Sequence, residues 1–195
     1  MTFWAGHCRV SVGVPFLAAA ALLLALDRSG TAAAGLACAA LHEAAHLAAM
    51  KWAGCMPREI RFTAFGIDIV RPGENRSYGR DVFVSLAGPF ANLAAFLFSW
   101  CFEKTAGPYP AVNFLLFALN ILPVAPLDGG QAFLSALCLR TRREKAEKIV
   151  SAVSFCTLLP LAVLGILVLL RSKWNFTLLF AACYLAALLL MKKER

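Results

Sequence analysis

The apolar run Thr31–Ala53 carries His42, Glu43 and His46 in its interior, with no other ionisable residue before Lys51. The run is long enough to cross a bilayer as a helix. Residues four apart share a helix face, so the two imidazoles can bind one Zn²⁺, and the carboxylate beside them can take a proton from water. Polar groups inside a membrane are costly and usually functional. The pattern therefore predicts a hydrolytic metal site within the membrane. The competing interpretation is that the histidines only hydrogen-bond to a neighbouring helix.

The composition is that of a membrane protein. Of 195 residues, 61% are hydrophobic and 15% are charged, whereas about a quarter of the residues in a soluble domain are charged. The net charge of +8 does not indicate nucleic-acid binding, because Lys and Arg lie in the gaps between apolar runs and form no stripe with aromatic residues. We expect one domain over residues 1–195 and no nucleic-acid partner.

Six apolar segments approach the length of a membrane span, which predicts an all-α polytopic membrane protein of about six transmembrane helices. The segments are approximately Val10–Leu26, Thr31–Ala53, Val82–Phe102, Tyr109–Leu139, Ile149–Leu170 and Trp174–Met191. The fourth is too long for one simple span and contains Pro123, Pro126, Gly129 and Gly130, which predict a broken helix.

The basic residues predict the orientation in the membrane. When sides alternate at each span, most of the 19 Lys and Arg fall on one side, which is expected to be cytoplasmic. Both termini and the two large loops then lie in the cytoplasm, and the first segment is retained as a span rather than cleaved as a signal peptide. The charged segment Arg140–Lys148 is expected to be a cytoplasmic loop that contacts lipid headgroups.

Asp128 is the candidate third ligand, because a catalytic zinc site usually has three protein ligands and one open position. Among the acidic residues, only Glu43 and Asp128 lie well inside the predicted spans. Both of their spans run toward the cytoplasm, so His46 and Asp128 can meet at one depth. The alternative is that Asp128 caps the helix after the break, and one carboxylate can serve both purposes.

The segment Pro57–Arg71 predicts a short β-hairpin at the membrane surface, after the second span. Apolar Ile60, Phe62 and Ala64 alternate with polar residues, and Gly66 interrupts the pattern. An exposed strand edge can hold an extended peptide, with Phe65 at the tip lining the entrance. The alternative is a surface loop without substrate contact.

Three motifs together resemble the site-2 protease family (peptidase family M50) of intramembrane zinc metalloproteases. They are HEAAH at residues 42–46, SLAGPFAN at residues 85–92 and NILPVAPLDGG at residues 120–130. The six-span layout is similar to the sporulation branch of that family, whose members often carry a C-terminal CBS domain. We expect none here, because the sequence ends directly after the last predicted span.

The resemblance implies a role for each matched residue. His42, His46 and Asp128 would bind one zinc ion per chain, and Glu43 would be the catalytic base. Substrate-binding positions match at Asn120, Pro126 and Asn92, and the membrane-associated hairpin would hold an extended substrate.

The resemblance also implies a setting and partners. The protein would lie in a bacterial cytoplasmic membrane and cleave membrane-embedded or membrane-tethered proteins, such as a transcription-factor precursor. We expect its activity to be controlled by regulatory membrane proteins or by substrate supply.

Two other functions fit part of the pattern. A transporter or ion-binding protein also uses a broken helix with polar residues such as Asn120 and Asp128. That class usually has an internal repeat of spans, which is not evident, and it does not explain Glu43 between two spaced histidines. The second is a member of the same fold that binds substrates without cutting, and the complete set of His, Glu, His and Asp argues against it.

Overall fold

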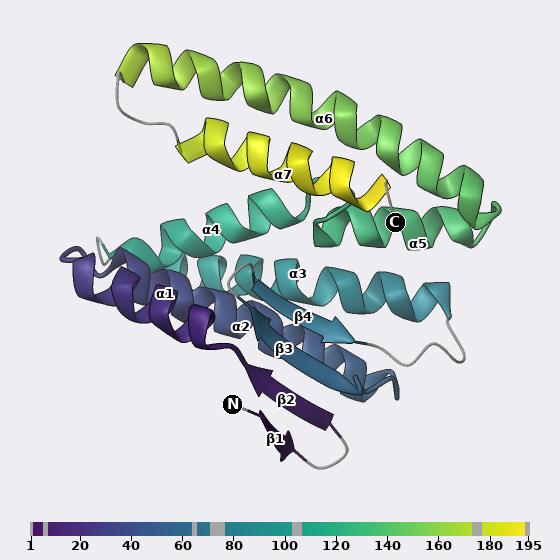
Figure 1. The fold of residues 1–195 in the computed structure, drawn as a ribbon, viewed down its shortest axis with the longest axis horizontal. Coiled ribbons are helices and arrows are strands. Elements are labelled where there is room, and N and C mark those ends of the chain that lie inside the picture. Colours follow the sequence, from purple (N-terminus) through teal and green to yellow (C-terminus); the bar gives the residue numbers. More distant parts are fainter. Residues whose placement is uncertain are drawn as a thin grey trace.

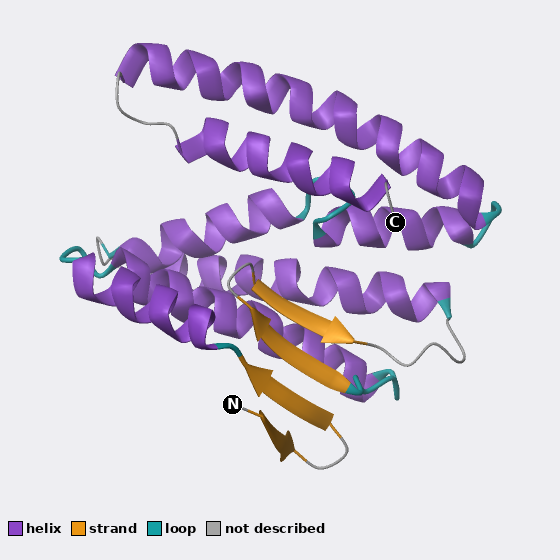
Figure 2. Ribbon diagram, in the orientation of Figure 1, coloured by secondary structure: helices purple, strands orange, loops and turns teal. Residues whose placement is uncertain are grey.

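A computed structural model describes residues 2–5, 8–63, 66–70, 77–102, 107–172 and 177–193. Within these ranges, the structure contains seven helices and four strands, and the strands lie before the first helix and between the second and third helices in the sequence (Figure 2). In chain order they are β1 (Thr2–Ala5), β2 (Cys8–Val12), α1 (Val14–Leu26), α2 (Thr31–Trp52), β3 (Glu59–Thr63), β4 (Gly66–Val70), α3 (Tyr78–Phe102), α4 (Pro108–Asn120), α5 (Asp128–Cys138), α6 (Arg143–Ser172) and α7 (Thr177–Lys193).

Helix α3 is the centre of the bundle, because it packs against α2, α4 and α5. Helices α6 and α7 form a pair that joins the rest through α5, and α1 lies against α2 (Figure 1). Buried Val124 and Ala125, from the connection between α4 and α5, join an apolar cluster with Val150 and Leu158 of α6 and Leu185 of α7. This cluster fixes the connection that leads to Asp128.

Three described helices are long and apolar enough to cross a membrane: α2, α3 over Tyr78–Cys101, and α6. Helix α1 is apolar but shorter, and it has no buried residue. Large apolar side chains remain exposed on the outside of the bundle, among them Leu23, Phe98 and Leu167. Such a surface is suited to lipid rather than water. The chain is therefore a membrane protein, whereas the count of six spans stays a prediction.

The long fourth segment is broken, as its prolines and glycines predict. Helix α4 ends at Asn120 and α5 begins at Asp128, and the intervening residues are not helical. Pro123 and Pro126 both lie in this interval, where the missing N–H groups do not interrupt a helix. The break places the first turn of α5 in the interior of the bundle rather than at its end.

A four-stranded sheet has the order β1-β2-β3-β4 and contacts α1 through β3. Strands β3 and β4 form an antiparallel pair with Ile60 opposite Ile69, in the segment where the alternation predicts a hairpin. Its association with the membrane stays a prediction. Strand β2 pairs with β1 antiparallel and with β3 parallel, which makes β1 and β4 the two edges.

Two expected boundaries are wrong. The first apolar segment does not begin its helix at Val10, because Cys8–Val12 is β2 and the helix starts at Val14 with a proline in its first turn. The segment Arg140–Lys148 is not a loop, because α6 begins at Arg143. Its Glu, Lys and Ala residues favour helix, and Arg143 Nε pairs with Glu147 Oε1 at 2.7 Å one turn later.

Candidate metal centre

The predicted histidines lie on one buried stripe of α2. Cys38, His42, His46 and Met50 follow one another at intervals of four residues, and all four are buried. Residues at this spacing share a helix face, and here that face packs against α3. The bundle therefore encloses both imidazoles, each with an exposed fraction of 6%.

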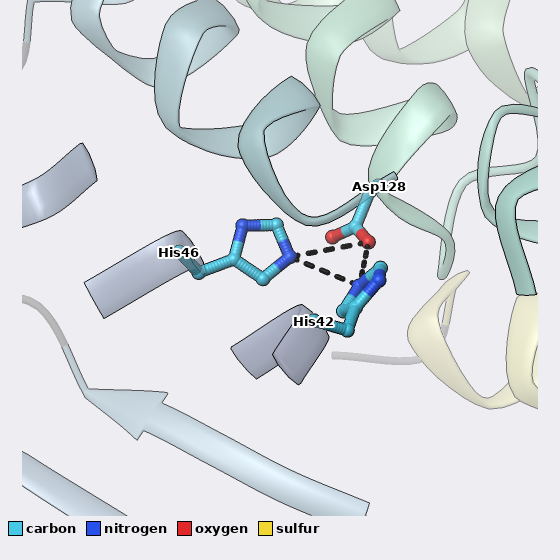
Figure 3. Close-up of side chains that lie close together, drawn as sticks. All are labelled: His42, His46 and Asp128. Carbon is cyan, nitrogen blue, oxygen red and sulfur yellow. Dashed lines mark hydrogen bonds and ion pairs between the residues drawn. The ribbon is translucent and has the colours of Figure 1, made fainter. Parts of the chain in front are cut away.

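The structure brings Asp128 to the two histidines. Oδ2 of Asp128 lies 2.8 Å from Nε2 of His42 and 3.3 Å from Nε2 of His46. The two Nε2 atoms lie 3.1 Å apart. Figure 3 shows both imidazoles directed toward the carboxylate, which comes from a segment more than 80 residues later. Among the described residues these three form a group of possible metal ligands, with one ligand atom from each and all atoms within 4.8 Å.

The backbone of α3 fixes the ring of His46. Nδ1 of His46 lies 2.7 Å from the carbonyl oxygen of Val84. A carbonyl only accepts hydrogen bonds, so Nδ1 carries the hydrogen and donates it. In the neutral ring, Nε2 then has a free lone pair that can bind a metal.

A side-chain amide fixes the ring of His42 in the same way. Nδ1 of His42 lies 2.6 Å from Oδ1 of Asn92, which is fully buried on α3. Nδ2 of Asn92 donates to the carbonyl oxygen of Cys38 at 3.2 Å and to Oδ1 of Asn113 at 2.8 Å. With its NH₂ group so committed, Asn92 presents its oxygen to His42, and Nδ1 of His42 carries the hydrogen.

The resulting donor set fits a cation. Two imidazole nitrogens with free lone pairs and one carboxylate oxygen converge on a single buried point. Three acceptors at such distances repel one another unless a proton or a metal ion lies between them. Two His nitrogens and one carboxylate oxygen are the ligands of one of the common catalytic zinc sites, and the other ring nitrogens are hydrogen-bonded as metal ligands usually are.

Gly88 leaves room for this group on α3. A Cβ at this position would lie 2.6 Å from Nε2 of His42 and no farther from Nε2 of His46. Gly88 and Asn92 are four residues apart, so one face of α3 supplies both the space and the hydrogen bond. This arrangement explains why glycine and asparagine occur together in the segment SLAGPFAN.

Asp128 is the first residue of α5, and its position depends on the break before it. No side chain caps this helix, and the carboxylate bonds to His42 instead. Its charge still lies at the positive end of the helix dipole, so the ligand and helix-start interpretations are compatible. A Cβ on Gly129 or Gly130 would collide with the backbone of Ile121 or Val124, respectively. Glycine is therefore required where α5 meets the break.

Helix α6 holds the break from its other side. Oγ of Ser154 accepts a 2.9 Å hydrogen bond from the backbone N–H of Ala125 and donates to the carbonyl of Val150 at 2.7 Å. Nε2 of Gln131 donates to the carbonyl of Ala125 at 2.5 Å. Both polar backbone atoms of Ala125 are thus bonded in a segment without regular structure.

Glu43 lies beside the group without joining it. It follows His42 on α2, is half-buried, and is close enough to His42, His46 and Asp128 to interact with each electrostatically. A carboxylate in this position can exchange a proton with a water molecule held near the three ligands.

Of the predicted substrate-binding residues that the structure describes, only some contact the three candidate metal ligands. Asn92 contacts His42 directly, a hydrogen bond that the sequence did not indicate. Nδ2 of Asn120 donates to the carbonyl of Leu116 in its own helix, and Pro126 lies half-buried in the break. Phe65 lies outside the described residues.

Sequence reasoning also missed Asn113, Ser154 and the role of Gly88. Each acts through a contact with a distant segment, which a local pattern does not contain. The motif around Gly88 was the one available signal.

Two comparisons relate the chain to known proteins. Residues 100–161, which include Asp128, match the model of peptidase family M50. The fold is similar to that of the site-2 protease from Methanocaldococcus jannaschii, with a TM-score of 0.63 over 95% of this chain and 91% of that chain, at 17% sequence identity. The search of curated proteins found no match. The family model matches about a third of the chain, and the structural similarity shows a fold shared with that site-2 protease.

Proposed function

We propose that this protein is an intramembrane zinc metalloprotease that cleaves membrane-embedded or membrane-tethered proteins. The observation that carries the proposal is the convergence of His42, His46 and Asp128 inside a membrane-spanning bundle. Both histidines have their Nδ1 atoms hydrogen-bonded elsewhere, which leaves their Nε2 atoms for one metal ion.

The chemistry follows from the residues present. Zn²⁺ held by these three side chains would polarise the scissile carbonyl and increase the acidity of water. Glu43 takes the proton of the attacking water and delivers it to the nitrogen of the leaving amine. The enclosing helices keep the carboxylates and imidazoles in place, so little reorganisation is needed during the reaction.

The substrate must reach the site in an extended form, because the peptide bonds of a helix are hydrogen-bonded and shielded. Strand β4 is an edge of the sheet and offers a template for strand addition. Asn120 is the last residue before the break that leads to Asp128, and Pro126 lies within it. We propose that both residues hold the substrate there. Phe65 would contact it between β3 and β4.

We place the protein in a bacterial cytoplasmic membrane, with both termini in the cytoplasm, because the basic residues favour that side. The substrate class that fits is a transcription-factor precursor tethered to the membrane, whose release is controlled by other membrane proteins. This proposal follows the resemblance to the sporulation branch of the family, which processes a transcription-factor precursor.

The test combines metal analysis with cleavage. Candidate tethered precursors are co-expressed with wild-type protein or with the Glu43→Gln variant, and the zinc content of each purified protein is measured. We expect one bound zinc in both proteins and truncation of a precursor by the wild type alone. The Glu147→Gln variant is the matched control, because it removes an exposed carboxylate on α6.

Two results would contradict the proposal. A purified wild-type protein that binds no zinc would exclude the metal site. Bound zinc, with no difference between wild type and Glu43→Gln in a proteome-wide search for truncated proteins, would favour the non-cleaving or transporter alternatives, and flux measurements would then separate those two.

A further inference from the structure

Asn113 of α4 is fully buried, and hydrogen bonds to its amide nitrogen and its amide oxygen fix the orientation of the amide. Nδ2 of Asn113 donates to the carbonyl of Tyr109, one turn earlier, at 3.1 Å. Since a carbonyl only accepts, the amide nitrogen must be on that side and Oδ1 must be on the other. Oδ1 then accepts the 2.8 Å hydrogen bond from Nδ2 of Asn92.

The orientation of the Asn92 amide is determined in the same way. Its NH₂ group has two hydrogens, and two acceptors face it: Oδ1 of Asn113 and the carbonyl oxygen of Cys38. A flipped Asn92 amide would place its own oxygen against both acceptors. Buried acceptors that face one another without a hydrogen are strongly disfavoured. The oxygen of Asn92 is therefore held toward His42 by two independent interactions.

We infer that Asn113 is a positioning residue for the metal site: it holds the Asn92 amide so that Nδ1 of His42 carries a hydrogen and Nε2 is free for the ion. The inference rests on the metal site proposed above. Asn113 does not touch the three ligands in any hydrogen bond that the structure shows, and it acts through Asn92 alone.

Loss of Asn113 would make the flipped state of Asn92 accessible. Only the carbonyl of Cys38 would then oppose the flip. The flipped amide would donate to Nδ1 of His42, and the ring would carry its hydrogen on Nε2, where it can donate to Asp128 at 2.8 Å. A ring in that tautomer cannot use Nε2 as a metal ligand.

The experiment measures the hydrogen on Nδ1 of His42 directly, by ¹⁵N–¹H correlation spectra of ¹⁵N-histidine-labelled, metal-free protein in detergent. A His7→Gln background leaves two histidines, and His46 is the internal reference because its bond to Val84 does not involve Asn113. The variants are Asn113→Ala and Asn113→Asp. Thr157→Val is the matched control, because it removes a hydroxyl that bonds only within α6.

We expect the Nδ1 hydrogen of His42 in the wild type and in Thr157→Val, and its loss in a measurable fraction of Asn113→Ala molecules. Zinc affinity should fall in Asn113→Ala, by no more than the about 10- to 100-fold found when the hydrogen-bond partner of a metal ligand is itself removed. Asn113→Asp keeps an acceptor for Asn92 and, as the neutral acid, a donor toward the carbonyl of Tyr109, so it should retain the Nδ1 hydrogen and bind zinc nearly as the wild type does.

An unchanged Nδ1 signal and unchanged zinc affinity in folded Asn113→Ala would overturn the inference. If that variant does not fold, Asn113→Asp decides, because loss of the Nδ1 hydrogen while the acceptor is kept would also overturn it. A wild-type protein that binds no zinc would contradict the proposed function. The Nδ1 signal of His42 in the metal-free protein would still test the role of Asn113.

Discussion

Gly88 of α3 lies directly against His42 of α2, so that a Cβ on Gly88 would be 2.6 Å from Nε2 of the imidazole. This is the nitrogen that faces Asp128. The absence of a side chain at position 88 therefore keeps open the point on which the three candidate ligands converge. Its neighbour Pro89 lacks an N–H, which leaves this turn of α3 with fewer hydrogen bonds of its own.

We predict that Gly88→Ala abolishes zinc binding without unfolding the protein. The added methyl group would displace both imidazoles, and a misplacement of about 1 Å can cost about 100-fold in activity. The readouts are bound zinc per chain and cleavage of a tethered precursor. Gly35→Ala on α2 is the matched control, because its Cβ would meet nothing within 4 Å. Full zinc occupancy in Gly88→Ala would show that the ion binds at a site other than the group of His42, His46 and Asp128.

The hydrogen bond from Ala125 to Ser154 predicts a variant that loosens the break. Ser154→Ala would leave the buried N–H of Ala125 without its acceptor. Such a loss costs about 1–3 kcal/mol. Thermal unfolding in detergent should show a lower midpoint for Ser154→Ala than for Thr157→Val, which removes a hydroxyl bonded within its own helix. Equal midpoints would show that the hydrogen bond to Ser154 does not stabilise the break.

Metal removal should destabilise the protein only when its ligands are intact. A ligand that binds the folded state alone stabilises it by about 2.7 kcal/mol at 100 times its dissociation constant. We therefore expect a chelator to lower the unfolding midpoint of the wild type. It should leave Asp128→Ala unchanged, because the third ligand is already missing. A chelator effect of the same size in both proteins would place the stabilising ion outside the group of His42, His46 and Asp128.

The helical part of the fold could be predicted because lipid-facing helices need long apolar runs, and such runs are visible without knowledge of their neighbours. Pro123 and Pro126 revealed the break in the same local way. The parallel pairing of β2 with β3 could not be predicted, because Val10 and Ile60 are partners from segments some 50 residues apart. The strands are also short, and β2 directly precedes an apolar helix whose pattern it continues.

The candidate site likewise has some features that the local sequence predicts and others that depend on contacts between distant segments. The spacing of His42 and His46 and the isolation of Asp128 among apolar residues are properties of the sequence itself. Asn113 is different, because one amide in an apolar helix is usually a packing contact. Its connection to His42 passes through Asn92 on another helix and exists only in the folded chain.

The turn before α2 predicts a dependence of stability on pH. Oδ1 of Asp27 accepts hydrogen bonds from Oγ of Ser29 at 2.6 Å and from its N–H at 2.9 Å, and Oδ2 accepts from the N–H of Ala32 at 2.7 Å. These bonds, with that from the Ser29 hydroxyl the strongest, hold the pKa of Asp27 below its ordinary value. The ionised carboxylate thus stabilises the start of the helix that carries both histidines.

Because the pKa is lower in the folded state, the stabilisation is complete above the ordinary value of about 3.9 and is lost as pH falls through the folded value. We predict that wild type unfolds at a higher temperature than Asp27→Asn near neutral pH. The difference should decrease below about pH 4, because protonation makes the two side chains alike in charge. Unfolding midpoints measured in detergent from pH 7 to pH 3 provide the test. A difference that stays constant over this range would mean that the hydrogen bonds, rather than the charge, make the contribution of Asp27.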